Sequence, residues 1–106
     1  MDIPEIDVDQ LAERLDRGDV VLVDVRRPEE WDEAHIEGAS LVTLDTLPDR
    51  MDELPSSVPL LVICRSGARS AVATQALVGA GYDAANVAGG MLAWIESGRV
   101  VARGEG

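Results

Sequence analysis

The segment L-L-V-I-C-R-S-G-A-R-S-A-V-A-T-Q-A-L-V-G-A, residues 60–80, joins an apolar run to a glycine-containing loop and then to an alanine-rich stretch. Residues 60–64 are all apolar, which is typical of a strand buried on both faces of a parallel sheet. The run from 70 to 80 is rich in Ala, Val and Leu and predicts a helix, which Gly81 ends. We therefore expect a buried strand that delivers Cys64 to a tight loop in front of a helix.

The same alternation of strand and helix extends in both directions along the chain. Asp7 and Gln10 form a capping-box pattern at the start of a helix that Gly18 ends. Strands are expected at 20–25, 39–44 and 85–88, and helices after Pro28, at 47–54 and at 91–97. Short strands and helices in alternation predict an α/β fold: a small parallel sheet with helices on both faces.

The absence of repeats and linkers predicts one domain over residues 1–106. Its core is expected over about residues 5–101, with a frayed tail at 102–106. With 106 residues, 46% of them hydrophobic, the chain can bury a modest core.

Charge and composition exclude several classes of function. The net charge is −11, and residues 1–53 carry 17 acids against 5 arginines, so a nucleic-acid partner is not expected. There is no lysine, which rules out a Schiff-base or P-loop lysine. One cysteine and one histidine cannot form an internal disulfide or supply a zinc site.

Nothing in the sequence indicates export or a membrane. The N-terminus lacks the basic and apolar regions of a signal peptide, and no apolar run approaches the length of a membrane helix. We expect a cytoplasmic protein whose lone thiol stays reduced.

The loop after the buried strand carries the chemistry. Cys64 stands at the carboxyl end of a strand, where α/β sheets bind ligands. Backbone amides at the following helix N-terminus, together with Arg65 and Arg69, favour a thiolate and an anionic substrate at one place. A lone buried cysteine is often an inert core residue, but the glycine and the two arginines favour a reactive one.

Other polar residues have structural interpretations. Asp24 and Arg26, at the end of the other buried strand, are expected to form a structural pair, with tuning of the site as the alternative. His35 is expected to make a structural hydrogen bond, and Trp31 and Trp94 to pack in the core.

Three segments together resemble the rhodanese family. The loop C-R-S-G-A-R, residues 64–69, resembles its active-site loop. Residues 22–39, L-V-D-V-R-R-P-E-E-W-D-E-A-H-I-E-G-A, are similar to its first box, and residues 89–94, G-G-M-L-A-W, to its last. The order is that of the family, and the resemblance covers about residues 5–101. One departure is Ala34, where the family usually has glycine.

The resemblance implies a thiosulfate:acceptor sulfurtransferase. Cys64 is then the catalytic residue and carries a persulfide, with no other cofactor and no metal. Substrate-binding and supporting residues follow from it: the first are Arg65, Ser66, Gly67, Ala68 and Arg69, and the second are Asp24, Arg26 and Ser70. The partners implied are a small anionic sulfur donor and a cyanide or thiol acceptor, which includes a thiol protein.

Two alternatives remain. A non-catalytic sulfur carrier or persulfide sensor would use the same Cys64. A phosphatase or arsenate reductase also pairs a cysteine with an arginine, but those loops place five residues between the two. Here Cys64 and Arg69 are separated by four, which suits a smaller bowl.

Overall fold

The computed structural model describes residues 2–104 and contains one five-stranded parallel sheet. Its strands are β1 (Glu5–Ile6), β2 (Val21–Asp24), β3 (Ser40–Leu41), β4 (Leu60–Ile63) and β5 (Ala84–Val87). They lie in the order β1-β5-β4-β2-β3, and every neighbouring pair is parallel. The fully buried strand β4 is therefore central, and Cys64 leaves the sheet in the middle of its carboxyl edge.

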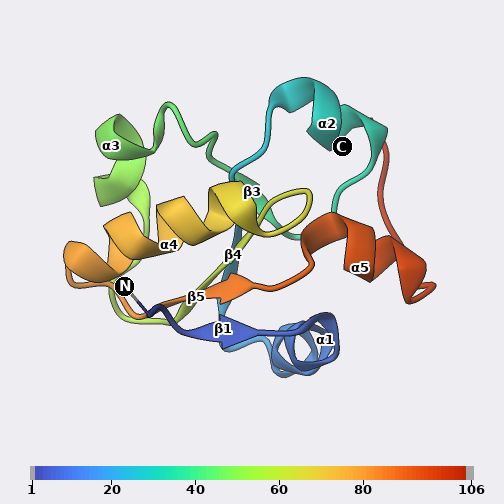
Figure 1. Cartoon of the computed structure of the whole chain (residues 1–106), viewed down its shortest axis with the longest axis horizontal. Helices are drawn as coiled ribbons and strands as arrows, with labels where there is room; N and C mark the ends of the chain where they lie inside the picture. Colours follow the sequence, from blue (N-terminus) through green and yellow to red (C-terminus); the bar gives the residue numbers. More distant parts are fainter. Residues whose placement is uncertain (1, 105–106) are drawn as a thin grey trace.

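The helices cover both faces of this sheet, as the alternation predicted (Figure 1). They are α1 (Val8–Arg17), α2 (Pro28–Glu33), α3 (Leu47–Arg50) with the 3-10 turn η1 (Met51–Glu53), α4 (Ala68–Gly79) and α5 (Gly90–Glu96). One core cluster joins the sheet to α1 and α5 through Leu11, Met91 and Trp94. The other joins it to α3 and α4 through Leu47 and Leu77.

Side chains along β4 alternate between these two cores. Leu60 and Val62 belong to the cluster under α3 and α4, whereas Leu61 and Ile63 belong to the cluster under α1 and α5. Because successive strand residues point to opposite faces, the all-apolar run fills both cores at once. Cys64 continues this alternation on the side of α4.

The capping box of α1 is confirmed. The Asp7 carboxylate accepts from the Gln10 amide at 2.8 Å, and the Gln10 side chain accepts from the Asp7 amide at 2.9 Å. Gly18 ends the helix with a positive φ of 72°. No helix among residues 2–104 is long and apolar enough to cross a membrane.

The structure differs from expectation at several element boundaries. The strand expected at 39–44 is only two residues long, and the helix expected at 47–54 divides into α3 and η1. Helix α4 begins at Ala68 rather than at Ser70. Its N-cap is Gly67, which has a left-handed backbone conformation. Strand β1 was not expected.

The expectation of a frayed tail is wrong for residues 102–104. Ala102 forms an antiparallel bridge with His35, and the Gly104 amide donates to the Asp32 carbonyl at 2.7 Å. The Arg103 guanidinium donates to the carbonyl of Glu33 at 2.7 Å. Residues 105–106 lie outside the described part of the chain.

Candidate active site

The loop after β4 curls around the sulfur of Cys64. Gly67, the N-cap of α4, has a φ of +107°, a conformation that favours glycine. This turn lets the Gly67 amide donate to Cys64 Sγ at 3.1 Å. Cys64 itself is only 1% exposed, so very little of its surface is open to a reactant.

The first turn of α5 holds the same loop from behind. The amides of Met91 and Leu92 donate to the carbonyls of Cys64 and Arg65 at 2.9 and 3.0 Å. A Cβ atom at Gly90 would lie 2.4 Å from the Cys64 carbonyl oxygen. Gly90 is therefore required for α5 to approach the loop this closely.

Ser70 and Asn86 form a buried polar support beneath the sulfur. The Ser70 hydroxyl lies 3.2 Å from Cys64 Sγ and also within hydrogen-bond distance of Asn86 Oδ1. The Asn86 amide group donates to the Gly67 carbonyl at 3.2 Å and to a Glu5 carboxylate oxygen at 2.9 Å. Because a hydroxyl has one proton, Ser70 donates to the sulfur or to Asn86 at any moment, not to both.

The loop favours the thiolate. Burial raises the pKa of Cys64 and is the largest single influence, but hydrogen bonds to the sulfur outweigh it. The strongest of these comes from the Ser70 hydroxyl, followed by the backbone amides of Ser70, Gly67 and Ser66. The net result is a pKa below the ordinary value of the thiol. The backbone amides expected from the sequence do contribute to the lowered pKa of Cys64, together with the Ser70 hydroxyl, whereas neither arginine is among the main causes.

Arg69 is already paired with an acid. Its two terminal nitrogens donate to the two carboxylate oxygens of Glu30 in α2, at 2.7 and 2.8 Å. The hydrogen bond from Arg69 lowers the pKa of Glu30 to about 2, and the same pairing raises the pKa of Arg69. The expected positive charge of Arg69 is thus largely compensated before any anion arrives.

The other loop residues lie at the surface. Arg65, Ser66 and Ala68 are exposed. Arg65 lines a shallow hollow of about 250 Å³ together with Glu30 and Leu92, on the side of the loop that faces α5. Arg65 has no ion-pair partner among the described residues.

Asp24 and Arg26 form the structural pair that the sequence predicted. The Arg26 guanidinium donates to both Asp24 oxygens, with a shortest distance of 2.8 Å, and to the Ala34 carbonyl at 2.8 Å. Both residues are buried, at 0% and 5% exposure. The pair connects the end of β2 to α2, and thereby positions the helix that carries Glu30.

His35 also has the structural role expected of it. Its Nδ1 lies 2.8 Å from the Trp31 carbonyl, and its ring stacks on the Trp31 ring at 3.8 Å between centroids. Trp94 is buried in the core, as expected. Trp31 is only half-buried on α2, so it does not have the core position that was expected. Residues 2–104 contain no group of three or more His, Cys, Asp or Glu side chains that could hold a metal.

Two residues of this arrangement were missed by sequence reasoning. Asn86 is the one polar residue in the strand A-A-N-V, which was the signal available in the sequence; the structure buries it at 2% exposure. Glu30 lies in the acidic first turn of α2, and nothing in its sequence context indicates that it pairs with Arg69. Ser70, Gly67 and Asn86 form a hydrogen-bonded cradle around Cys64 Sγ, whereas Glu30 holds Arg69.

Comparison with known proteins gives a consistent result. Residues 7–97 match the family described as the Rhodanese-like domain. A protein named sulfurtransferase from Allochromatium vinosum is 39% identical over 106 residues, which covers 98% of this chain and 99% of that protein. The crystal structure of a rhodanese-related protein from Thermoplasma volcanium superposes with a TM-score of 0.89 at 29% identity, covering 93% and 97% of the two chains. A thiosulfate sulfurtransferase from Pseudomonas aeruginosa has a TM-score of 0.88 at 27% identity, covering 97% of this chain and 21% of that one.

Proposed function

Because the chain belongs to the rhodanese-like domain family, we propose that it transfers sulfane sulfur from thiosulfate, or a similar anionic donor, to a thiophilic acceptor through a persulfide on Cys64. The observation that carries this proposal is the position of Cys64 Sγ, which accepts hydrogen bonds from Gly67 and Ser70 in a loop that lowers its pKa. The name of the similar Pseudomonas protein supports thiosulfate as the donor.

In the first step, the Cys64 thiolate attacks the outer sulfur of thiosulfate. A bond forms between Sγ and that sulfur, the sulfur–sulfur bond of thiosulfate breaks, and its electron pair leaves with sulfite. The outer sulfur now carries the negative charge. Fixed amide and hydroxyl donors around Sγ stabilise this anion without reorganising, as an oxyanion hole does. The terminal sulfur of thiosulfate is a single atom, which is small enough to approach a nucleophile that is only 1% exposed.

In the second step, an acceptor attacks the outer persulfide sulfur. Cyanide takes this sulfur as thiocyanate, or a thiolate takes it as a new persulfide, and the electron pair of the broken bond returns to Cys64. The cycle needs no bound cofactor or metal because the sulfur is held covalently. It does require a reduced Cys64, which fits a cytoplasmic location.

The cationic residues contribute unequally. Arg69 is held by Glu30, so it contributes mainly by fixing the loop against α2. Arg65 is an exposed residue of the loop and provides positive charge for the sulfonate-like oxygens of the donor.

Mass spectrometry of the intact protein tests the proposal. After thiosulfate treatment and removal of excess donor, we expect a gain of one sulfur atom, which cyanide then removes as thiocyanate. Cys64→Ser is the blank, because the chain has no other cysteine. A wild type that gains no sulfur, or a serine variant that gains as much, contradicts the proposal. Removal of the sulfur in a single round, without turnover, would instead indicate a carrier.

A further inference from the structure

A chain of hydrogen bonds leads from the surface of β1 to the sulfur of Cys64. The exposed Glu5 carboxylate accepts from the Asn86 side-chain amide at 2.9 Å. The Ser70 hydroxyl lies within hydrogen-bond distance of both Asn86 Oδ1 and Cys64 Sγ. Because Ser70 and Asn86 are 0% and 2% exposed, bulk solvent does not offer this hydroxyl an alternative partner.

The orientation of the Asn86 amide is set by two acceptors. One amide hydrogen is taken by the Gly67 carbonyl at 3.2 Å and the other by the Glu5 carboxylate. A carbonyl and an ionised carboxylate only accept hydrogen bonds, so a flipped amide would place Oδ1 against two acceptors. Asn86 Oδ1 therefore faces Ser70, and it can only accept from the hydroxyl.

The register of the sheet holds Asn86 beneath the loop. Asn86 pairs with Val62 across β5 and β4, and Cys64 lies two residues beyond Val62, in the same core cluster. An added Cβ at Gly67 would lie 3.8 Å from Asn86 Nδ2, so this side chain packs against the loop. Asn86 thus belongs to an internal strand of the sheet and supports the loop from outside it.

The charge on Sγ decides which acceptor the Ser70 hydroxyl serves. When Cys64 is a thiolate, its sulfur attracts the hydroxyl proton, and Asn86 Oδ1 loses that donor. When Cys64 is a thiol, Ser70 donates to Asn86 and accepts from the S–H group. Asn86 therefore favours an uncharged Sγ, whereas the loop amides favour a charged one.

Sulfur loading also removes the charge from Sγ, because the negative charge of a persulfide lies on its outer sulfur. We propose that Asn86 is a positioning residue of a hydroxyl switch: it draws the Ser70 hydroxyl away from Sγ once sulfur is bound, and thereby favours the persulfide over the free thiolate. The hydroxyl rotates and keeps its proton, so no proton is transferred. The persulfide part of this inference rests on the proposed sulfur transfer, whereas the competition between thiol and thiolate does not.

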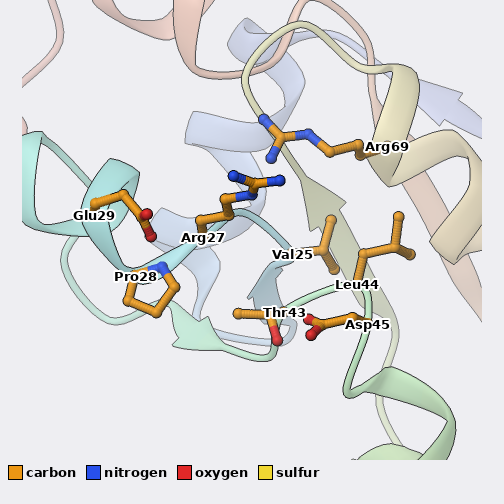
Figure 2. A pocket seen from close by; sticks show the side chains of 8 residues that line it. All are labelled: Val25, Arg27, Pro28, Glu29, Thr43, Leu44, Asp45 and Arg69. Atoms are coloured by element: carbon orange, nitrogen blue, oxygen red, sulfur yellow. The ribbon is translucent and has the colours of Figure 1, made fainter.

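The charged groups near Cys64 are separate from this switch. Glu30 of α2 holds the Arg69 guanidinium, which Figure 2 shows beside that of Arg27. The cleft in this view is not lined by Cys64, Ser70 or Asn86. Further charges near the loop belong to an exposed arginine, a buried ion pair and an exposed carboxylate, which are Arg65, Arg26 with Asp24, and Glu5. Asn86→Leu changes none of these charges.

Alkylation of Cys64 over a range of pH tests the competition without any sulfur transfer. Asn86→Leu keeps the shape of the side chain but offers Ser70 no acceptor, and the Gly67 carbonyl keeps the Ala71 amide as a donor at 3.1 Å. We expect the midpoint of alkylation rate against pH to fall by about half a unit to one unit, as for one hydrogen bond. A merely structural role predicts the opposite sign, because a loosened loop withdraws amide donors from the sulfur.

Two further variants isolate the route. In a Ser70→Ala background, Asn86→Leu is expected to leave the midpoint unchanged, because the hydroxyl that connects Asn86 to the sulfur is absent. Thr74→Val is the matched control, since Thr74 is also 0% exposed and its hydroxyl donates to the Ser70 carbonyl at 2.7 Å. The switch is wrong if Asn86→Leu raises the midpoint or does not move it, if its effect persists without the Ser70 hydroxyl, or if Thr74→Val lowers the midpoint equally.

Nuclear magnetic resonance of the wild type gives a second measurement, which does not require Asn86→Leu to fold. The side-chain carbonyl carbon of Asn86 is expected to change its resonance with the same midpoint as alkylation, because Oδ1 loses the Ser70 hydroxyl when Cys64 ionises. Ser70→Ala is expected to abolish most of this change. A carbonyl resonance that does not follow the ionisation of Cys64 overturns the switch.

The loading equilibrium tests the persulfide part. At a fixed ratio of thiosulfate to sulfite, and at a pH above both midpoints, intact-mass analysis is expected to show a loading equilibrium about threefold to tenfold weaker in Asn86→Leu than in the wild type. Equal loading overturns the proposed preference for the persulfide. Midpoints that move as expected in a protein that gains no sulfur contradict the proposed function and support the competition. Persulfide formation with an unmoved midpoint contradicts the switch alone.

Discussion

Removal of the Arg26 side chain is expected to destabilise the fold far more than its role at the edge of a site suggests. The Arg26 guanidinium is the counter-ion of a fully buried Asp24 carboxylate and also donates to two carbonyls, of Ala34 at 2.8 Å and of Glu30 at 3.3 Å. In Arg26→Met, the Asp24 carboxylate keeps the Arg26 backbone amide at 3.0 Å but loses its balancing charge.

Breaking one side of a buried ion pair costs about 3–5 kcal/mol. Small domains have a free energy of unfolding of about 5–15 kcal/mol, so the variant is expected to lose a large share of its stability. For a chain of this size, the unfolding temperature falls by about 4–8 °C for each kcal/mol lost.

Urea unfolding followed by circular dichroism measures the change in the free energy of unfolding. Two further variants serve as comparisons. Arg17→Met breaks an exposed pair with Glu13, and such pairs contribute about 0–1 kcal/mol. The double variant Asp24→Leu/Arg26→Met removes both buried charges and is expected to be more stable than Arg26→Met alone. The reasoning is refuted if Arg26→Met costs no more than Arg17→Met, or if the double variant is less stable than Arg26→Met. Persulfide loading per folded molecule in the double variant then tests whether the pair also tunes the site.

Three further variants test other parts of the site. Ser70→Ala removes the strongest of the hydrogen bonds that lower the pKa of Cys64, so the midpoint of alkylation rate against pH is expected to move upward; an unmoved midpoint contradicts the assigned bond. The pKa of Glu30 is lowered to about 2 from 4.5, so the stability from its ion pair is present above about pH 4.5 and is lost as the pH falls towards 2. Glu30→Gln is therefore expected to lose less stability than the wild type over that interval, and equal losses would show that the pair does not contribute. Gly90→Ala forces a Cβ against the loop and is expected to cost more than about 2 kcal/mol, whereas Gly79→Ala, with open space around it, is expected to be neutral or stabilising. Similar costs for the two glycine variants would contradict the close approach of α5.

The fold followed from local patterns where those patterns were long enough to be unambiguous. Residues 60–64 have no polar side chain, as expected for a strand that is buried on both faces. The capping box of Asp7 and Gln10 depends on four consecutive residues only. Strand β1 has two residues and exists because Glu5 and Ile6 pair with Asn86 and Val87. No local pattern identifies a strand that depends on a partner 81 residues away.

The candidate site was predictable to the same extent. The loop, its glycine and the reactive Cys64 are contiguous, so their chemistry could be inferred from sequence. The partner of Arg69 lies 39 residues away in α2, and a charged side chain gives no indication of which opposite charge the fold brings to it. The support from Asn86 was hidden for the same reason, since its contacts come from two distant segments, Glu5 and residues 67–70.

The bridge between Ala102 and His35 makes the last described residues a strap across α2. The strap continues through the contacts of Arg103 and Gly104 with the carbonyls of Glu33 and Asp32. A protease cut just after residue 101 would release it and loosen the helix whose Glu30 holds Arg69. Domain boundaries drawn at the end of the sequence resemblance would make the same cut. Excised versions of this domain therefore need residues 102–104 if the sulfur cradle is to keep its shape.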